Sequence, residues 1–242
     1  MKNLYTSILT IFLLAGCTKT PDIRSVITKL ELSKRQLPAD GQSSVELSVI
    51  LDSKASSDRR SVIFSASAGS FSSGNDKVTA KAEFDNGVLV AKATLKAPFE
   101  PGTIMVTVQP EFDSPITEFV LTDSITATFS EAATITLNPS SFGIGSNHLN
   151  EIQLTARIRN IDKRNVSKGV NVLLEDSLVT GGPALGSFRD RQTMTADSSK
   201  VSAWYSAAMY PIGTAIRIRA TVLDKDLQKT GISDAITITV NL

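Results

Sequence analysis

The chain has little of the chemistry on which most enzymes and metalloproteins depend. Its 242 residues include one cysteine, Cys17, and one histidine, His148. A single cysteine excludes a disulfide within the chain, so stability has to come from a packed core, and these two residues offer few ligands to a transition metal. The sequence also lacks a GxSxG motif, a phosphate-binding glycine loop and an HExxH pair. We therefore expect no enzymatic activity, no cofactor and no metal.

An excess of charge of one sign is also missing. Lys and Arg number 25, and Asp and Glu number 24. Removing residues 1–16, in which Lys2 is the only charged residue, leaves 25 − 1 = 24 basic residues against 24 acidic ones. A neutral chain has no broad electrostatic attraction for nucleic acid or anionic lipid. We expect no nucleic-acid partner.

Long apolar runs are absent except near the beginning of the chain. There, MKNLYTSILTIFLLAGC combines the basic Lys2 with a mostly apolar stretch over residues 4–14 and small residues before Cys17. This order is typical of a secretory signal, and the stretch is shorter than the roughly 20 residues that a membrane span needs. The alternative to a role for Cys17 is an ordinary secretory signal in which this cysteine is incidental.

The ending Leu-Ala-Gly-Cys, residues 14–17, resembles the lipobox of bacterial lipoproteins. The resemblance implies a signal peptide over residues 1–16, cleavage before Cys17, and acyl chains such as palmitate on its thiol and on the new amino terminus. Several acyl chains, each contributing about 0.8 kcal/mol per buried methylene, hold a domain durably on a membrane. Thr18 is not the aspartate associated with inner-membrane retention in enteric lipoproteins. We expect anchoring in the outer membrane of a Gram-negative bacterium, facing either the periplasm or the outside.

After Cys17 and a polar tether, residues 17–25, the chain consists of short runs in which apolar and polar residues alternate. Such runs predict β-strands. The residues expected to face the core are Val45, Leu47, Val49 and Leu51 in the run 45–52, and Ile152, Leu154, Ala156 and Ile158 in the run 152–160. Asp-Asn-Gly at 85–87 predicts a tight turn between strands, because Asn and Gly tolerate positive φ.

Five segments recur in the same order, which predicts an internal repeat. Residues 123–129 return at 234–240 and 102–108 at 213–222, both 111 residues later; 45–52 return at 152–160 with an offset of 107; 69–71 return at 186–188, and 30–32 at 135–137. We expect two similar all-β domains, residues 26–130 and 131–242. About seven strands in about 100 residues fits an immunoglobulin-like (Ig-like) β-sandwich.

The first repeat resembles the bacterial Ig-like domains of the invasin and intimin type. The resemblance is carried by the Pro-Ala-Asp-Gly turn at 38–41, the Val-x-Phe strand at 62–64, the Gly-x-Phe corner at 69–71 and Gly-Thr at 102–103. The second repeat has FGIGSNH, residues 142–148, in place of the Pro-Ala-Asp-Gly turn, and Val-Asn-Val, residues 170–172, in place of Val-x-Phe. The resemblance implies tandem Ig-like domains that act as stiff spacers or in cell adhesion.

Trp204 and Tyr205 form the main aromatic cluster, with Tyr210 nearby. Neighbouring residues on a strand face opposite sides of a sheet, so one of the pair should be buried and the other exposed to a ligand such as a sugar. A buried tryptophan is the more common outcome in a sandwich, but the sequence leaves the choice open. Both residues are therefore candidate ligand-contacting aromatics.

Other polar residues are interpreted as structural. His148 lies in a Gly-Ser-Asn loop and should be solvated, with no nucleophile at a workable distance; Asp85, Asp224 and Asp226 could bind calcium but fit surface turns better. Arg157 and Arg159 should lie on one sheet and Arg217 and Arg219 on the other, so that the four make no single patch. The predicted protein is a lipid-anchored adhesion or spacer module with an unidentified protein or glycan partner. The alternatives are a glycan-binding accessory lipoprotein and a structural subunit of an envelope or secretion assembly.

Overall fold

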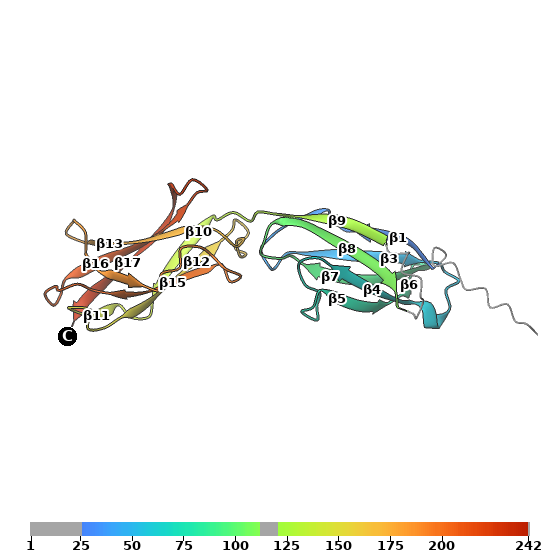
Figure 1. The fold of residues 1–242 in the computed structure, drawn as a ribbon, viewed down its shortest axis with the longest axis horizontal. Helices are drawn as coiled ribbons and strands as arrows, with labels where there is room; N and C mark the ends of the chain where they lie inside the picture. Colours follow the sequence, from blue (N-terminus) through green and yellow to red (C-terminus); the bar gives the residue numbers. More distant parts are fainter. Residues whose placement is uncertain (1–25, 112–120, 242) are drawn as a thin grey trace, which may run out of the picture.

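The computed structural model describes residues 26–111 and 121–241, and these residues form two β-sandwiches placed end to end (Figure 1). The expected signal peptide, Cys17 and the tether lie outside the described residues. Within them, no helix is both long and apolar enough to cross a bilayer. The one helical turn described is a 3-10 helix, Ser57–Arg59.

The first sandwich pairs a four-stranded sheet, in the order β1-β3-β7-β6, with a five-stranded sheet, in the order β2-β9-β8-β4-β5. Its strands are β1 (Ile27–Leu32), β2 (Gln36–Pro38), β3 (Ser44–Leu51), β4 (Ser61–Ala66), β5 (Lys77–Lys81), β6 (Glu83–Asp85), β7 (Val88–Lys96), β8 (Gly102–Pro110) and β9 (Leu121–Thr128). All pairs are antiparallel except β2 with β9, which run parallel. This is an Ig-like arrangement of two facing sheets.

The second sandwich repeats the plan with sheets in the orders β10-β12-β15-β14 and β11-β17-β16-β13. Its strands are β10 (Thr134–Pro139), β11 (Gly143–Gly145), β12 (Ile152–Arg159), β13 (Val172–Leu178), β14 (Ser187–Arg189), β15 (Lys200–Ser206), β16 (Ala215–Leu223) and β17 (Lys229–Asn241). The parallel pair of β11 with β17 corresponds to that of β2 with β9. The predicted all-β fold with two tandem sandwiches is confirmed.

Alternation along the strands produces two separate cores, one in each sandwich. The residues predicted to face inward on β3 and β12 are all buried, and every one is at most 4% exposed. Phe64 on β4 is completely buried in the first core and Tyr205 in the second. The Asp-Asn-Gly turn joins β6 to β7 as predicted, with positive φ at both Asn86 and Gly87, because a two-residue hairpin turn needs this conformation.

The strand pairing corrects the predicted repeat offset of 111. Ile104 lies opposite Ile125 in the first domain, and Ile216 lies opposite Ile238 in the second. All four side chains are buried, so the equivalent positions are offset by 216 − 104 = 112 and 238 − 125 = 113. An offset of 111 would align buried Ile104 with Ala215, whose side chain is on the other face of β16. For β9 and β17 an offset of 111 would keep the inward face, so here the parallel pairs decide the register. Leu37 lies opposite Ala127 and Ile144 opposite Val240, and 240 − 127 = 113.

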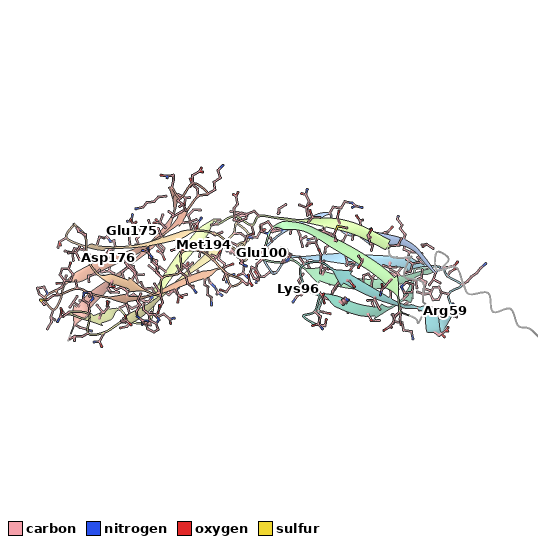
Figure 2. All side chains as sticks on the ribbon, viewed as in Figure 1. Arg59, Lys96, Glu100, Glu175, Asp176 and Met194 are labelled. Atoms are coloured by element: carbon pink, nitrogen blue, oxygen red, sulfur yellow. The ribbon has the colours of Figure 1, made fainter. Side chains whose placement is uncertain are left out.

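A hydrogen-bonded joint connects the two sandwiches. Ser167 Oγ donates to the Ala39 carbonyl at 2.8 Å, the Lys168 amide donates to the Phe99 carbonyl at 2.9 Å, and Arg164 Nη1 donates to Ser43 Oγ at 2.8 Å. Figure 2 shows Glu100 at this joint, where it forms an ion pair with Lys168. Ser130, in the connection itself, is buried and also binds Ser167.

The Pro-Ala-Asp-Gly turn forms the first domain's half of this joint. Buried Asp40 accepts hydrogen bonds from the amides of Gln42 and Ser43 and from the Ser43 hydroxyl. Gly41 has φ +65°, and a Cβ on it would come within 2.2 Å of the Phe99 ring. This turn therefore requires glycine for both backbone and packing reasons. Its hydrogen bonds hold Ser43 in place to receive Arg164 of the second domain.

Candidate interaction surfaces

Trp204 and Tyr205 lie on β15 and point to opposite sides of its sheet. Tyr205 is completely buried, whereas Trp204 is 36% exposed on the outer face. The alternation was predicted, but the exposed residue is the tryptophan rather than the tyrosine. Tyr205 is therefore excluded as a ligand-contacting residue, because no ligand can reach it in the folded domain. Trp204 remains a candidate.

Tyr205 organises the core of the second domain through its ring and its hydroxyl. The hydroxyl donates to Asp176 Oδ2 at 2.8 Å, and the same oxygen accepts the Gly186 amide at 2.8 Å (Asp176 is labelled in Figure 2). Burial, and then the bond to Asp176, raise the pKa of Tyr205 far above its usual range. A Cβ at position 186 would lie 2.2 Å from the hydroxyl oxygen. The second Gly-x-Phe corner thus needs its glycine to make room for Tyr205.

Trp204 is flanked by polar side chains on neighbouring strands. It lies opposite Gln153 of β12 on one side and Arg189 of β14 on the other. The Arg189 guanidinium carbon is 5.9 Å from the tryptophan ring centre, within cation–π range. Arg189 also binds Glu151 with its Nε at 3.1 Å and its Nη2 at 2.6 Å, and this hydrogen bonding lowers the pKa of the exposed Glu151 carboxyl.

The outer face of the same sheet continues with further hydrogen-bonding groups. In the adjacent row Thr155 lies opposite Ser202, and Gln192 Oε1 accepts bonds from both the amide and the hydroxyl of Ser202. The row beyond places Arg157 opposite Lys200. An aromatic ring beside amide, hydroxyl and guanidinium groups can stack on a sugar ring and hydrogen-bond its hydroxyls. We call this face, residues Gln153, Thr155, Arg189, Ser202 and Trp204, the Trp204 face.

His148 contacts a hydroxyl, contrary to the prediction that no nucleophile would lie near it. Its Nδ1 is 2.9 Å from Ser206 Oγ. Ser206 is buried, and among the described residues no carboxylate is recorded against the other ring nitrogen. A hydrolase of the serine type needs an accessible hydroxyl and a third group that orients the histidine. The contact instead attaches the loop after β11 to the end of β15.

The carboxylates considered for calcium serve as turn residues. Asp224 Oδ1 accepts the amides of Asp226 and Gln228 at 2.9 and 2.8 Å, while Asp85 binds Lys92 at 3.0 Å. Among residues 26–111 and 121–241, no group of three or more His, Cys, Asp or Glu side chains has the proximity that a metal site needs. All three carboxylates lie in or next to turns between strands, as interpreted from the sequence.

The four arginines lie on two different sheets, as expected. Arg157 and Arg159 belong to β12, whereas Arg217 and Arg219 belong to β16. Arg159 donates to the side chain of Asn165, near the joint. The four therefore make no single basic surface.

Some backbone groups on two edge strands of the second domain are bound by other parts of the chain. The backbone amide of Leu137 on β10 donates to Asp234 Oδ2 at 2.8 Å. On the other sheet, the Val172 amide at the beginning of β13 donates to the Thr193 carbonyl, and Asn171 bridges to Met194, which is labelled in Figure 2. A strand edge recruits other chains through its free backbone groups. These contacts occupy one amide of β10 and the beginning of β13, and the alternative of a subunit in an envelope or secretion assembly stays a prediction.

Comparison with known proteins agrees with the fold. No protein-family model matches the chain, and no curated protein matches its sequence. Among solved structures, invasin, a bacterial integrin-binding protein, aligns with a TM-score of 0.57 at 15% identity, over 88% of this chain and 38% of that one. The fold is that of tandem bacterial Ig-like domains.

Two further neighbours align less closely. The Yersinia pseudotuberculosis adhesin InvE aligns with a TM-score of 0.46 at 16% identity, over 90% of this chain and 61% of that one. The D0–D1 domain of intimin aligns with a TM-score of 0.34 at 15% identity, over 88% of this chain and 98% of that one. This Ig-like chain spans less than two thirds of the InvE and invasin chains with which it aligns.

Proposed function

We propose that this Ig-like chain is a non-enzymatic adhesion or spacer module of the bacterial outer membrane, anchored through acyl chains on Cys17. The observation that supports the proposal best is the hydrogen-bonded joint, in which Arg164, Ser167 and Lys168 bind the end of the first domain. Two sandwiches joined end to end carry the far end of the chain away from residue 26 (Figure 1). An anchored spacer needs such an extended shape, because its binding surface must reach past the membrane.

A cell-adherence assay tests this proposal. A non-adherent Gram-negative host producing the full chain should bind to epithelial cells or to abiotic surfaces at least several-fold more than the host carrying an empty vector. The Cys17→Ser chain, made at the same level, is the matched control and should give no increase, because a released module cannot hold a cell to a surface. Equal adherence of all three strains would refute an adhesive role.

A second candidate function is glycan binding, and the outward orientation of Trp204 favours it. Trp204→Ala should lower the affinity for a glycan found by array screening at least tenfold, because the stacking of a sugar ring on the indole is lost. The control is Phe84→Ala, which removes an aromatic side chain that is 55% exposed on the other domain. Thermal melts confirm that both variants fold. If both variants keep the parent affinity, or none of the glycans binds, the Trp204 face is not a sugar site.

A further inference from the structure

Exposed apolar side chains gather at the end of the second domain that lies opposite the joint. We call this end the distal tip, formed by residues 140–151, 179–186 and 207–214, beside the last residues of β17 at the C-terminal end in Figure 1. Its apolar residues, with their exposed fractions, are Phe142 (64%), Leu149 (76%), Val179 (44%), Leu185 (71%), Met209 (75%) and Ile212 (63%). Seven large apolar residues of the described chain are more than 60% exposed, and five of them are in this set. Scattered exposed residues need no explanation, but a cluster does.

Hydrogen bonds join the three segments into one surface. The amides of Asn147 and His148 donate to the Ala208 and Ala207 carbonyls, which places Leu149 beside the segment that carries Met209. The Tyr210 hydroxyl donates to the Ala184 carbonyl at 2.6 Å, which brings in the segment of Leu185.

The third connection runs through the end of β17. The Thr239 amide donates to the Phe142 carbonyl, and the Gly213 amide donates to the Val240 carbonyl next along the strand. Phe142 and Ile212 are therefore held on either side of β17. The six apolar side chains are fixed to one framework rather than carried on independent loops.

The same end of the first domain is built differently. The turn that contains Asp40 and Gly41 receives the second domain through polar groups. At the offset of 107, Gly41 corresponds to His148, and both have positive φ, at 65° and 56°. The second domain thus keeps the turn, but exposed Phe142 and Leu149 flank it. An end that receives a polar partner in one domain is apolar in the other.

Charge is nearly absent from the distal tip. Segments 179–186 and 207–214 contain no charged residue, and Glu151, the one acidic residue of segment 140–151, is bound to Arg189. Trp, Tyr and Arg are enriched at the centres of protein–protein interfaces, and the three segments contain only one residue of these types, Tyr210, whose hydroxyl is bound to the Ala184 carbonyl.

Backbone amides of Asn147, His148 and Gly213 already have partners within the tip. Exposed polar side chains of the tip, such as Asn147, Asn150 and Thr180, are uncharged, so entry into a lipid interface requires no unpaired charge to be desolvated.

We propose that the distal tip inserts its apolar side chains into the surface of a lipid bilayer. The module would then contact a membrane opposite to the one in which it is anchored. This inference rests on the proposed adhesive function and names the chemistry of its partner. Because the tip carries almost no charge, binding needs no anionic lipid and should be insensitive to salt. The fit to a flat bilayer also requires no complementary groove.

Vesicle binding tests the inference. Full-length secreted chain carrying Cys17→Ser, which has no acyl chain, is mixed with phosphatidylcholine vesicles and sedimented. The tip variant replaces Phe142, Leu149, Met209 and Ile212 with serine; the matched control replaces Phe84, Met105, Ile161 and Leu227, which are also exposed. We expect the tip variant to partition at least tenfold less, and the control within twofold of the parent. All three chains share the same N-terminus, so its contribution cancels.

A fluorescent probe locates the contact. In the Cys17→Ser chain no cysteine remains, so Met209→Cys places one environment-sensitive label at the tip and Leu227→Cys places it in the turn after β16. Vesicles should shift the emission of the first label to shorter wavelength and leave the second unchanged. Absence of parent binding, or equal loss in the tip and control variants, overturns the inference. So does tip-dependent self-association without vesicle binding, which would identify a second copy as the partner. If cells that produce the full chain still adhere when any of these three results is found, the adhesive function is retained and only the lipid partner is refuted.

Discussion

Cells that produce the Cys17→Ser variant should release the protein into the soluble fraction, whereas the parent chain should sediment with the membranes. The reason is that the predicted acyl chains on Cys17 are the only anchor that the sequence suggests. Fractionation followed by immunoblotting measures the change, which should involve nearly all of the protein. Labelling with radioactive palmitate should disappear in the same variant.

Thr18→Ser provides the control for this experiment. It changes the neighbouring hydroxyl residue and keeps the thiol, so both membrane association and palmitate labelling should persist. If palmitate labelling persists in the Cys17→Ser variant, or the parent chain takes up no label, the lipoprotein interpretation is wrong. A Cys17→Ser protein that stays in the membrane fraction without the label would be held by another part of the chain, such as the distal tip.

Phe64→Ala should lower the free energy of unfolding of the first domain by about 3–5 kcal/mol, because it leaves a large cavity in a packed core. Phe64 is completely buried and belongs to a core that is separate from the core of the second domain. The exposed Phe84 supplies the control, since Phe84→Ala removes the same ring from the surface and should cost about 1 kcal/mol or less.

The single tryptophan makes the effect assignable to one domain. Trp204 lies in the second domain, so its fluorescence reports the unfolding of that domain, while circular dichroism in the far ultraviolet reports the unfolding of both domains. In urea, Phe64→Ala should move the part of the dichroism transition that belongs to the first domain to lower urea concentration. The free energy of unfolding derived from tryptophan fluorescence should stay within about 0.5 kcal/mol of the parent value. An equal shift of both signals would mean that the joint makes the two domains one cooperative unit.

The joint and the distal tip differ in what they imply for binding. At the joint, Arg164, Ser167 and Lys168 hydrogen-bond polar groups of the first domain, so this end of the first domain is not accessible to other partners. The Trp204 face and the distal tip remain accessible on the second domain. A bound partner is therefore expected on the second domain, which lies farther from residue 26 than the first domain does (Figure 1).

Several features could be predicted because they depend on residues close together in the chain. Alternation identified the buried faces of β3 and β12, and Asn86-Gly87 identified a turn, since side-chain direction and positive φ are local properties. The burial of Tyr205 could also have been predicted. Val201 and Ala203 alternate in step with it on β15, and all three are buried. The frequency of buried tryptophans in sandwiches pointed the other way, and this left the choice between the two residues open.

Local sequence pattern by itself determined that the chain folds as two β-domains without a disulfide. The alternation of apolar and polar residues along a strand, and the residue types that a turn requires, depend only on residues close together in the chain. Tertiary structure alone decided the offsets of 112 and 113 between the domains, the contact of His148 with Ser206, and the distal tip. Phe142, Leu185 and Met209 are separated by more than 20 residues in sequence, and only the folding of two sheets over one core brings their loops to the same end. Long-range pairing between strands sets such positions, and no local pattern encodes them.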